Sequence, residues 1–144
     1  MSTENTPYER LGGEAGVREL VDRFYDLMDQ LESARHIRSL HAKSLKASRE
    51  KLFLFLSGWL GGPDLYVQKY GHPRLRARHL PFSIGQQERD EWMLCMRGAM
   101  DEMGLEDDLK SQLDAAFWKT ADFMRNRPEH EANGGLKIFP GPQG

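Results

Sequence analysis

The chain has 144 residues, of which 39% are hydrophobic and 29% are charged, and its formal net charge is -2. These values suit one soluble globular domain and argue against a nucleic-acid binder that depends on overall positive charge. The single cysteine, Cys95, excludes an internal disulfide and a site of several thiolates, while the polar N-terminus and the lack of a ~20-residue apolar run predict a cytoplasmic protein outside the membrane.

Apolar residues recur at helical spacing along most of the chain. The pattern predicts helices over residues 8–11, 14–28, 45–60, 85–103 and 106–124. Residues 31–44 indicate a helical fragment followed by a loop. Residues 64–84 are interrupted by Gly71, Pro73 and Pro81, which leaves at most a short helix over 74–79. No stretch alternates long enough to predict a strand, so the fold class is all-α. We expect one domain over residues 1–127 and a flexible tail over 128–144.

His79 has the most informative surroundings in the sequence. Four basic residues precede it without an intervening acid, and Leu-Pro-Phe follows it at residues 80–82. An imidazole between cations and an apolar wall suits haem, which combines iron, a porphyrin and anionic propionates. On composition alone, a surface or helix-capping histidine is the more frequent case. A short contact to a phosphate backbone is a weaker competing interpretation of the basic run.

Three kinds of side chain would complete a haem site. Candidates for an apolar slot are Leu52, Phe55, Leu56, Leu75, Phe82, Ile84 and Trp92. Candidates for the propionates are Lys51, Tyr66, His72, Arg74, Arg76 and Arg78. Tyr25, His41 and Trp92 each carry a polar hydrogen and could offer donors over one haem face, although such residues on an apolar stripe more often serve packing. Cys95 is predicted to be buried and inert, and His36 and His130 to be exposed without a role.

The chain resembles the group II, or O-type, truncated globins over roughly residues 7–125. The resemblance is carried by Gly-Trp-Leu-Gly-Gly-Pro at 58–63, Gly-His-Pro-Arg-Leu-Arg-Ala-Arg-His-Leu-Pro-Phe at 71–82 and Arg-Asp-Glu-Trp-Met-Leu-Cys-Met at 89–96. Tyr-Glu-Arg-Leu-Gly-Gly at 8–13 and Arg-Phe-Tyr at 23–25 agree in order and spacing. The motif around His79 and Trp92 is highly specific, and it reverses the preference for a surface histidine.

This resemblance implies a two-on-two helical sandwich around haem b. It implies His79 as the proximal iron ligand, and Tyr25 and Trp92 as distal hydrogen-bond donors. A variable distal position falls on His41, with Leu40 as the alternative because the loop spacing differs. Two further distal positions fall on Ser48 and Leu52, and the small Ser48 should leave that side open.

Three functions follow as hypotheses. The first is a haem protein that binds oxygen, carbon monoxide, nitric oxide or other diatomic ligands and releases them slowly, as a monomer or homodimer. The second is a redox enzyme with nitric oxide dioxygenase or peroxidase-like activity, for which we expect an external reductase. The third is a haem-free helical interaction module, against which the basic run before His79 argues.

Overall fold

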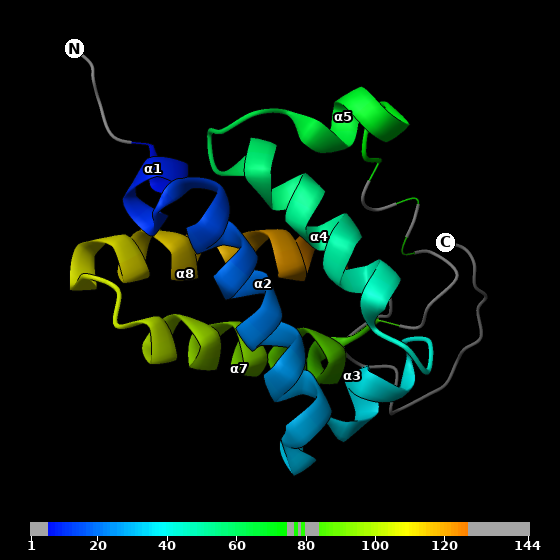
Figure 1. Ribbon diagram of the computed structural model, residues 1–144. Coiled ribbons are helices and arrows are strands. Elements are labelled where there is room, and N and C mark those ends of the chain that lie inside the picture. The colour runs from blue at the N-terminus through cyan, green and yellow to red at the C-terminus, as the bar shows by residue number, and fades with distance from the viewer. Residues whose placement is uncertain (1–5, 75–76, 78, 80–83, 127–144) are drawn as a thin grey trace.

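The computed structural model describes residues 6–74, 77, 79 and 84–126, and every regular element within these ranges is helical (Figure 1). In chain order the elements are α1 (Pro7–Leu11), α2 (Gly13–Gln30), the 3-10 turn η1 (Glu32–Ala34), α3 (Arg35–Ser39), α4 (Lys46–Trp59), α5 (Leu65–Tyr70), α7 (Gln86–Met103) and α8 (Asp107–Phe123). Over the same ranges, no helix has the length and apolar character needed to cross a membrane. The all-α prediction is confirmed.

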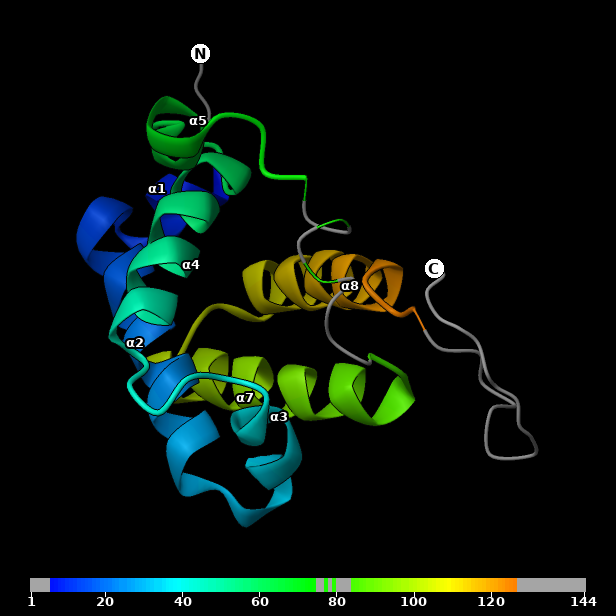
Figure 2. The same ribbon diagram turned by 90° about the vertical axis from the view of Figure 1, so that its right-hand side faces the viewer.

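The long helices pack as two pairs. α2 contacts α4 in one pair, and α7 runs antiparallel beside α8 in the other (Figure 2). α2 also packs across α7 and so joins the two pairs (Figure 1). The short helix α3 lies against α2 and α7, and α5 lies against α4. This arrangement leaves α4 facing the α7–α8 pair across a space that α3 closes at one end.

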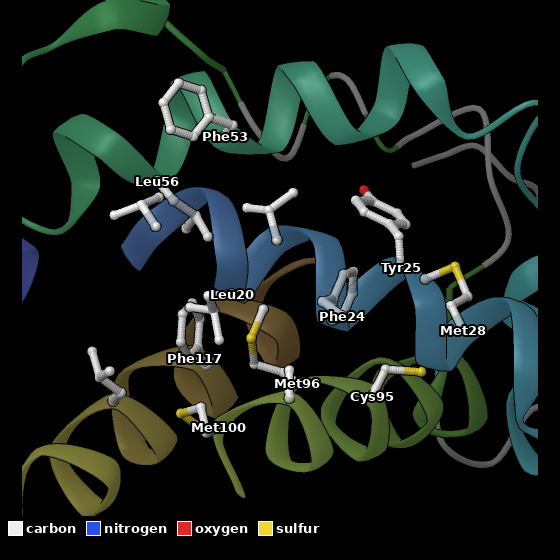
Figure 3. Close-up of a cluster of buried hydrophobic side chains, with 14 of the residues drawn as sticks. Leu20, Phe24, Tyr25, Met28, Phe53, Leu56, Cys95, Met96, Met100 and Phe117 are labelled. Atoms are coloured by element: carbon white, nitrogen blue, oxygen red, sulfur yellow. The ribbon is translucent and has the colours of Figure 1, made fainter. Parts of the chain in front are cut away.

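A core of apolar side chains holds α2 against α7 and α8 (Figure 3). α2 buries one stripe of residues at the helical spacing of three and four, namely Val17, Leu20, Val21, Phe24 and Met28. α7 contributes Cys95, Met96 and Met100, and α8 contributes Phe117. Each fully buried side chain of this size stabilises the fold by roughly 1.5–3 kcal/mol. The same burial raises the pKa of the Cys95 thiol to about 11, which keeps it protonated near neutral pH.

Local signals set the helix ends. The Thr6 hydroxyl accepts a hydrogen bond from the Glu9 amide at 3.2 Å, and the Glu9 carboxylate accepts from the Thr6 amide at 3.3 Å. This reciprocal cap begins α1. Gly12, with φ of 111°, ends it in a conformation that favours glycine. Gly16 allows the α1–α2 crossing, because a Cβ there would lie 1.9 Å from the Leu11 carbonyl oxygen.

The predicted helices agree with the structure to within two residues at each end, except in two places. α5 was not predicted, because six residues are too few to establish a helical period. The short helix over residues 74–79 does not include Arg74, whose φ of 50° is left-handed. Ala77 and His79 are helical, and the remaining residues of that stretch lie outside the described ranges. The expected tail over 128–144 also lies outside them.

Candidate functional site

A cavity of about 560 Å³ lies between α4 and the α7–α8 pair. This volume falls within the range of cofactor and ligand sites in proteins. Twelve residues that the sequence singled out line it: Tyr25, Leu40, His41, Ser48, Lys51, Leu52, Phe55, Leu56, Tyr66, His79, Ile84 and Trp92. Residues that were not proposed for the site also line it, among them Ile37, Trp59, Glu88, Arg89, Phe117 and Thr120. Segments far apart in the sequence therefore converge on one space.

Tyr25 brings a hydroxyl from α2 to the cavity. Its side chain is only 6% exposed, and its ring packs edge-on against Phe24 with centroids 4.8 Å apart. The hydroxyl points away from the core toward α4 (Figure 3), where Ser48 hydrogen-bonds it. Burial raises the pKa of Tyr25 far above its ordinary value, and the nearby Arg49 only partly opposes this. Tyr25 is therefore a neutral hydroxyl that can donate a hydrogen bond.

His41 lies in the loop after α3, and its ring meets that of Tyr25 edge-on with centroids 5.9 Å apart. Its Nδ1 is 2.9 Å from the Ile37 carbonyl oxygen. A carbonyl only accepts, so Nδ1 carries the proton and Nε2 of the neutral ring carries a lone pair. Burial lowers the pKa of His41, the hydrogen bond to Ile37 partly opposes this, and the positive charge of Arg38 lowers the pKa further. This corrects the expectation of a donor: the neutral ring presents an acceptor to the cavity.

Leu40 and His41 both line the cavity. The leucine contributes apolar surface and the histidine contributes a polar group, and the choice of His41 for the variable distal position stays a prediction.

Two glutamates of α7 hold α3 in place beside the cavity. The Ile37 amide donates to Glu91 Oε1 at 2.8 Å, and His36 Nε2 lies 2.5 Å from Glu88 Oε2. Glu88 is buried, and its other oxygen accepts from the Gly85 amide at 2.7 Å. His36 is exposed, as predicted, but it makes a contact between α3 and α7 that the sequence did not predict. No signal within the sequence of either helix predicts a bond between residues 52 positions apart.

His79 lines the cavity as predicted. Its backbone carbonyl accepts a hydrogen bond from Asn126 Nδ2 at 3.3 Å. The same Asn126 side chain accepts from the Ile84 amide at 2.9 Å, and the Asn126 amide donates to the Ile84 carbonyl at 2.8 Å. Asn126 thus ties the His79 segment and the approach to α7 to the end of α8. No motif in the sequence pointed to Asn126.

Aromatic rings form much of the apolar lining. Trp59 stacks on Phe117 with centroids 5.0 Å apart and an interplanar angle of 24°. Trp92 contacts Phe117 at 5.7 Å and Phe24 at 5.0 Å, so its ring is held between α2 and α8. Phe55 packs edge-on against Tyr66. These contacts give the cavity rigid flat walls, which suit a planar ligand.

The cations at the cavity differ in part from those expected. Lys51 lines it as predicted, and Arg89 lines it without having been predicted. Arg89 is anchored by Asp90 at 2.9 Å and Asp122 at 2.7 Å. His72 does not line the cavity: it is exposed, and its Nδ1 accepts from the Arg74 amide at 3.1 Å. Arg74 does not line it either. The other predicted contacts, Leu75, Arg76, Arg78 and Phe82, lie outside the described residues.

The donor set fits haem. A haem iron takes as few as one imidazole from the protein, with an apolar slot for the ring and cations for the propionates, and this cavity has residues of each kind. Within the described part of the chain, no three His, Cys, Asp or Glu residues converge as ligands for a bare metal ion.

Residues 6–126 match the family model of the bacterial-like globins. The chain belongs to this family. Membership makes it a haem-based oxygen-binding protein, and the resemblance drawn from the sequence is confirmed.

This globin is similar in sequence and in structure to individual truncated hemoglobins. It is 40% identical over 127 residues to the group 2 truncated hemoglobin YjbI of Bacillus subtilis, covering 88% of this chain and 93% of that one. The cold-adapted truncated hemoglobin of Pseudoalteromonas haloplanktis is 47% identical, with a TM-score of 0.84 over 86% of this chain and all of the other. The group II 2-on-2 hemoglobin of Agrobacterium tumefaciens is 46% identical, with a TM-score of 0.84 over 89% of this chain and all of the other. The globin therefore has the two-on-two fold.

Proposed function

We propose that this globin holds haem b through His79 and retains oxygen and other diatomic ligands in the cavity beside Tyr25, His41 and Trp92. One observation carries the proposal: side chains from α2, the loop after α3, α7 and the segment before α7 line a single aromatic-walled space. Haem in this space would supply an iron atom able to take a diatomic ligand.

Tyr25 is the principal ligand-retaining residue in this proposal. It is neutral, buried and hydrogen-bonded to Ser48, so its position is set before a ligand arrives. Trp92 adds an indole N–H from a ring that Phe24 and Phe117 hold in place. A donor aimed where negative charge collects contributes roughly 1.5–3 kcal/mol. Slow release follows, which suits a sensor, a scavenger or a redox protein better than an oxygen carrier.

The propionates would be bound by Lys51 and Tyr66, with Arg89 as a further cation at the cavity. Arg76 and Arg78 remain candidates from the sequence.

A redox enzyme is the second candidate, and His41 is the observation that favours it. A neutral imidazole and a tyrosine hydroxyl with ring centroids 5.9 Å apart form an acceptor and a donor of the kind that acid–base catalysis uses. Nitric oxide dioxygenation or peroxide reduction would then need electrons from an external reductase. We expect either form to act in the cytoplasm, as a monomer or homodimer.

Absorption spectra of the purified full-length protein test this proposal. We expect a Soret band in the ferric protein, and a shifted band after reduction with dithionite and addition of carbon monoxide. Protein that lacks a Soret band even after incubation with haem would instead support the haem-free interaction module.

A further inference from the structure

The hydrogen bond between His41 and the backbone of α3 determines what this residue offers to a ligand. Nδ1 lies 2.9 Å from the Ile37 carbonyl oxygen. The oxygen has no proton to give, so the proton of this bond belongs to Nδ1. A neutral imidazole carries one N–H only. Nε2 is therefore an acceptor in a cavity where Tyr25 and Trp92 can donate. The Glu88 carboxylate also lines this cavity, but its two oxygens are already bonded to His36 and to the Gly85 amide.

The Ile37 peptide that selects this tautomer is itself held on both sides. Its amide donates to Glu91 Oε1 at 2.8 Å, and its carbonyl also accepts from the Leu40 amide at 3.1 Å. The neighbouring His36 is bound to the buried Glu88 at 2.5 Å. The Leu40 bond holds the carbonyl directly, and the contacts of Ile37 and His36 with α7 hold the helix that carries it. The opposite tautomer of His41 would place two acceptors, Nδ1 and the carbonyl oxygen, against each other.

The charges near His41 also favour its neutral form. Arg38, on the same segment, is a cation that lowers the pKa of His41, while the hydrogen bond to Ile37 acts in the opposite direction. Arg49 lies over the neighbouring Tyr25 ring at 5.9 Å and is paired with Asp22 and Asp26. Burial is the largest cause of the lowered pKa of His41. The lone pair on Nε2 is thus available at neutral pH.

We propose that His41 is a proton acceptor in this cavity, and that the site accordingly favours small ligands that arrive as weak acids, such as hydrogen peroxide or hydrogen cyanide, over ligands that carry no proton. This inference rests on the haem function proposed above. It goes beyond that function because it names the chemical class of ligand that the loop after α3 selects.

The transfer of a proton from the ligand to His41 needs no further reactant. The bond from hydrogen to the ligand atom breaks, its electron pair stays on the ligand, and the proton forms a new bond to Nε2. His41 becomes an imidazolium with Nδ1 still bonded to Ile37, and the ligand becomes an anion. Nothing is oxidised or reduced. The Tyr25 hydroxyl, on the ring packed against His41, then stabilises the anion by donating to it.

Two association rates measured on the same full-length haem-loaded protein test the proposal. Hydrogen cyanide is a neutral acid at pH 7 and binds ferric haem as its anion, whereas carbon monoxide binds ferrous haem and has no proton to lose. In His41→Leu, we expect the ratio of the cyanide rate constant to the carbon monoxide rate constant to fall by about 10²-fold, the lower end of what a positioned acid–base group contributes. Taking the ratio removes any general effect on access to the cavity.

Two further variants distinguish an effect of proton uptake by His41 from an effect of its polarity and from an effect of the shape of the cavity. His41→Gln keeps a polar side chain that does not take up a proton near pH 7, so its ratio should fall as far as that of His41→Leu. Leu40→Ala changes the adjacent lining residue and should alter both rates by a common factor, which preserves the ratio. Haem content and far-UV circular dichroism establish that each variant is folded and loaded.

The tautomer can be measured without any variant. Nitrogen-15 NMR of histidine-labelled protein should find the His41 proton on Nδ1 and none on Nε2 at pH 7. A proton on Nε2, an unchanged ratio in His41→Leu, or a ratio restored by His41→Gln would each overturn the proposal. If the protein never forms a carbon monoxide complex, the proposed haem function is overturned instead. If the complex forms normally and the ratio of rate constants is unchanged in His41→Leu, only the role of His41 is overturned.

Discussion

Replacing Tyr25 with phenylalanine removes one hydroxyl from the cavity and little else. The ring is 6% exposed and packs against Phe24 at 4.8 Å and His41 at 5.9 Å. Phenylalanine can keep all of these contacts. The variant loses the hydrogen bond with Ser48 and the donor proposed for the bound ligand.

The size of the effect follows from the kind of hydrogen bond that is lost. A donor to a group with negative charge contributes about 1.5–3 kcal/mol. Each 1.4 kcal/mol corresponds to a factor of ten, so the rate of oxygen dissociation should rise by about tenfold to a hundredfold. The loss of the Ser48 contact should lower the free energy of unfolding by only about 1 kcal/mol, since that bond joins neutral groups.

Stopped-flow replacement of oxygen by carbon monoxide measures the dissociation rate directly. Tyr8→Phe is a matched control, because it removes a tyrosine hydroxyl in α1 that does not line the cavity. It should leave the rate unchanged. An oxygen dissociation rate in Tyr25→Phe equal to that of the control would refute the reasoning, since the hydroxyl would then not reach the ligand.

Three other changes have defined outcomes. His79→Ala should abolish or loosen haem binding while far-UV circular dichroism stays helical; full haem affinity with an unaltered ferrous spectrum would show that another residue binds the iron. The pKa of His41 in the folded protein lies below its ordinary value of 6.5. As the pH falls, the imidazole is therefore protonated first in the unfolded chain, so the free energy of unfolding decreases below about pH 6.5 and is retained above it. His41→Gln should make Tm fall less steeply over that range, and parallel melting curves would contradict the assignment. Gly16→Ala places a Cβ 1.9 Å from a backbone oxygen and should lower the free energy of unfolding by about 3 kcal/mol or more, measured by chemical denaturation. In the control Gly98→Ala, the Cβ meets only the end of a flexible leucine side chain at 2.8 Å, and the loss should be about 1 kcal/mol or less. Equal denaturation midpoints for the two variants would show that the backbone at Gly16 adjusts easily to a Cβ.

The long helices were predictable because the apolar residues that each of them buries recur at helical spacing in the sequence. In α2, Val17, Leu20, Val21, Phe24 and Met28 recur every three or four residues and are all buried. α5 was missed for the same physical reason, since one and a half turns cannot establish a period. Its anchor, Tyr66, is nevertheless 7% exposed and lines the cavity.

The site was predictable only in part. His79, Tyr25 and Trp92 were identified by a specific motif, and all three line the cavity. Glu88 was not, because a glutamate near the start of a helix usually faces solvent and interacts with the helix dipole. It is buried here because His36 and the Gly85 amide both bond to it.

By itself, the sequence determined the helical class, the apolar stripe of each long helix and the histidine expected at the iron. These depend on spacing within a few residues, or on a motif that is continuous in the chain. Only the tertiary structure decided the hydrogen-bonding character of His41 and the anchoring of α3, because Ile37 and Glu91 are 54 positions apart and their bond is 2.8 Å long. The ring nitrogen of His41 that keeps its proton is set by the Ile37 carbonyl four residues earlier, and the packing of α3 against α7 holds that carbonyl beside the cavity.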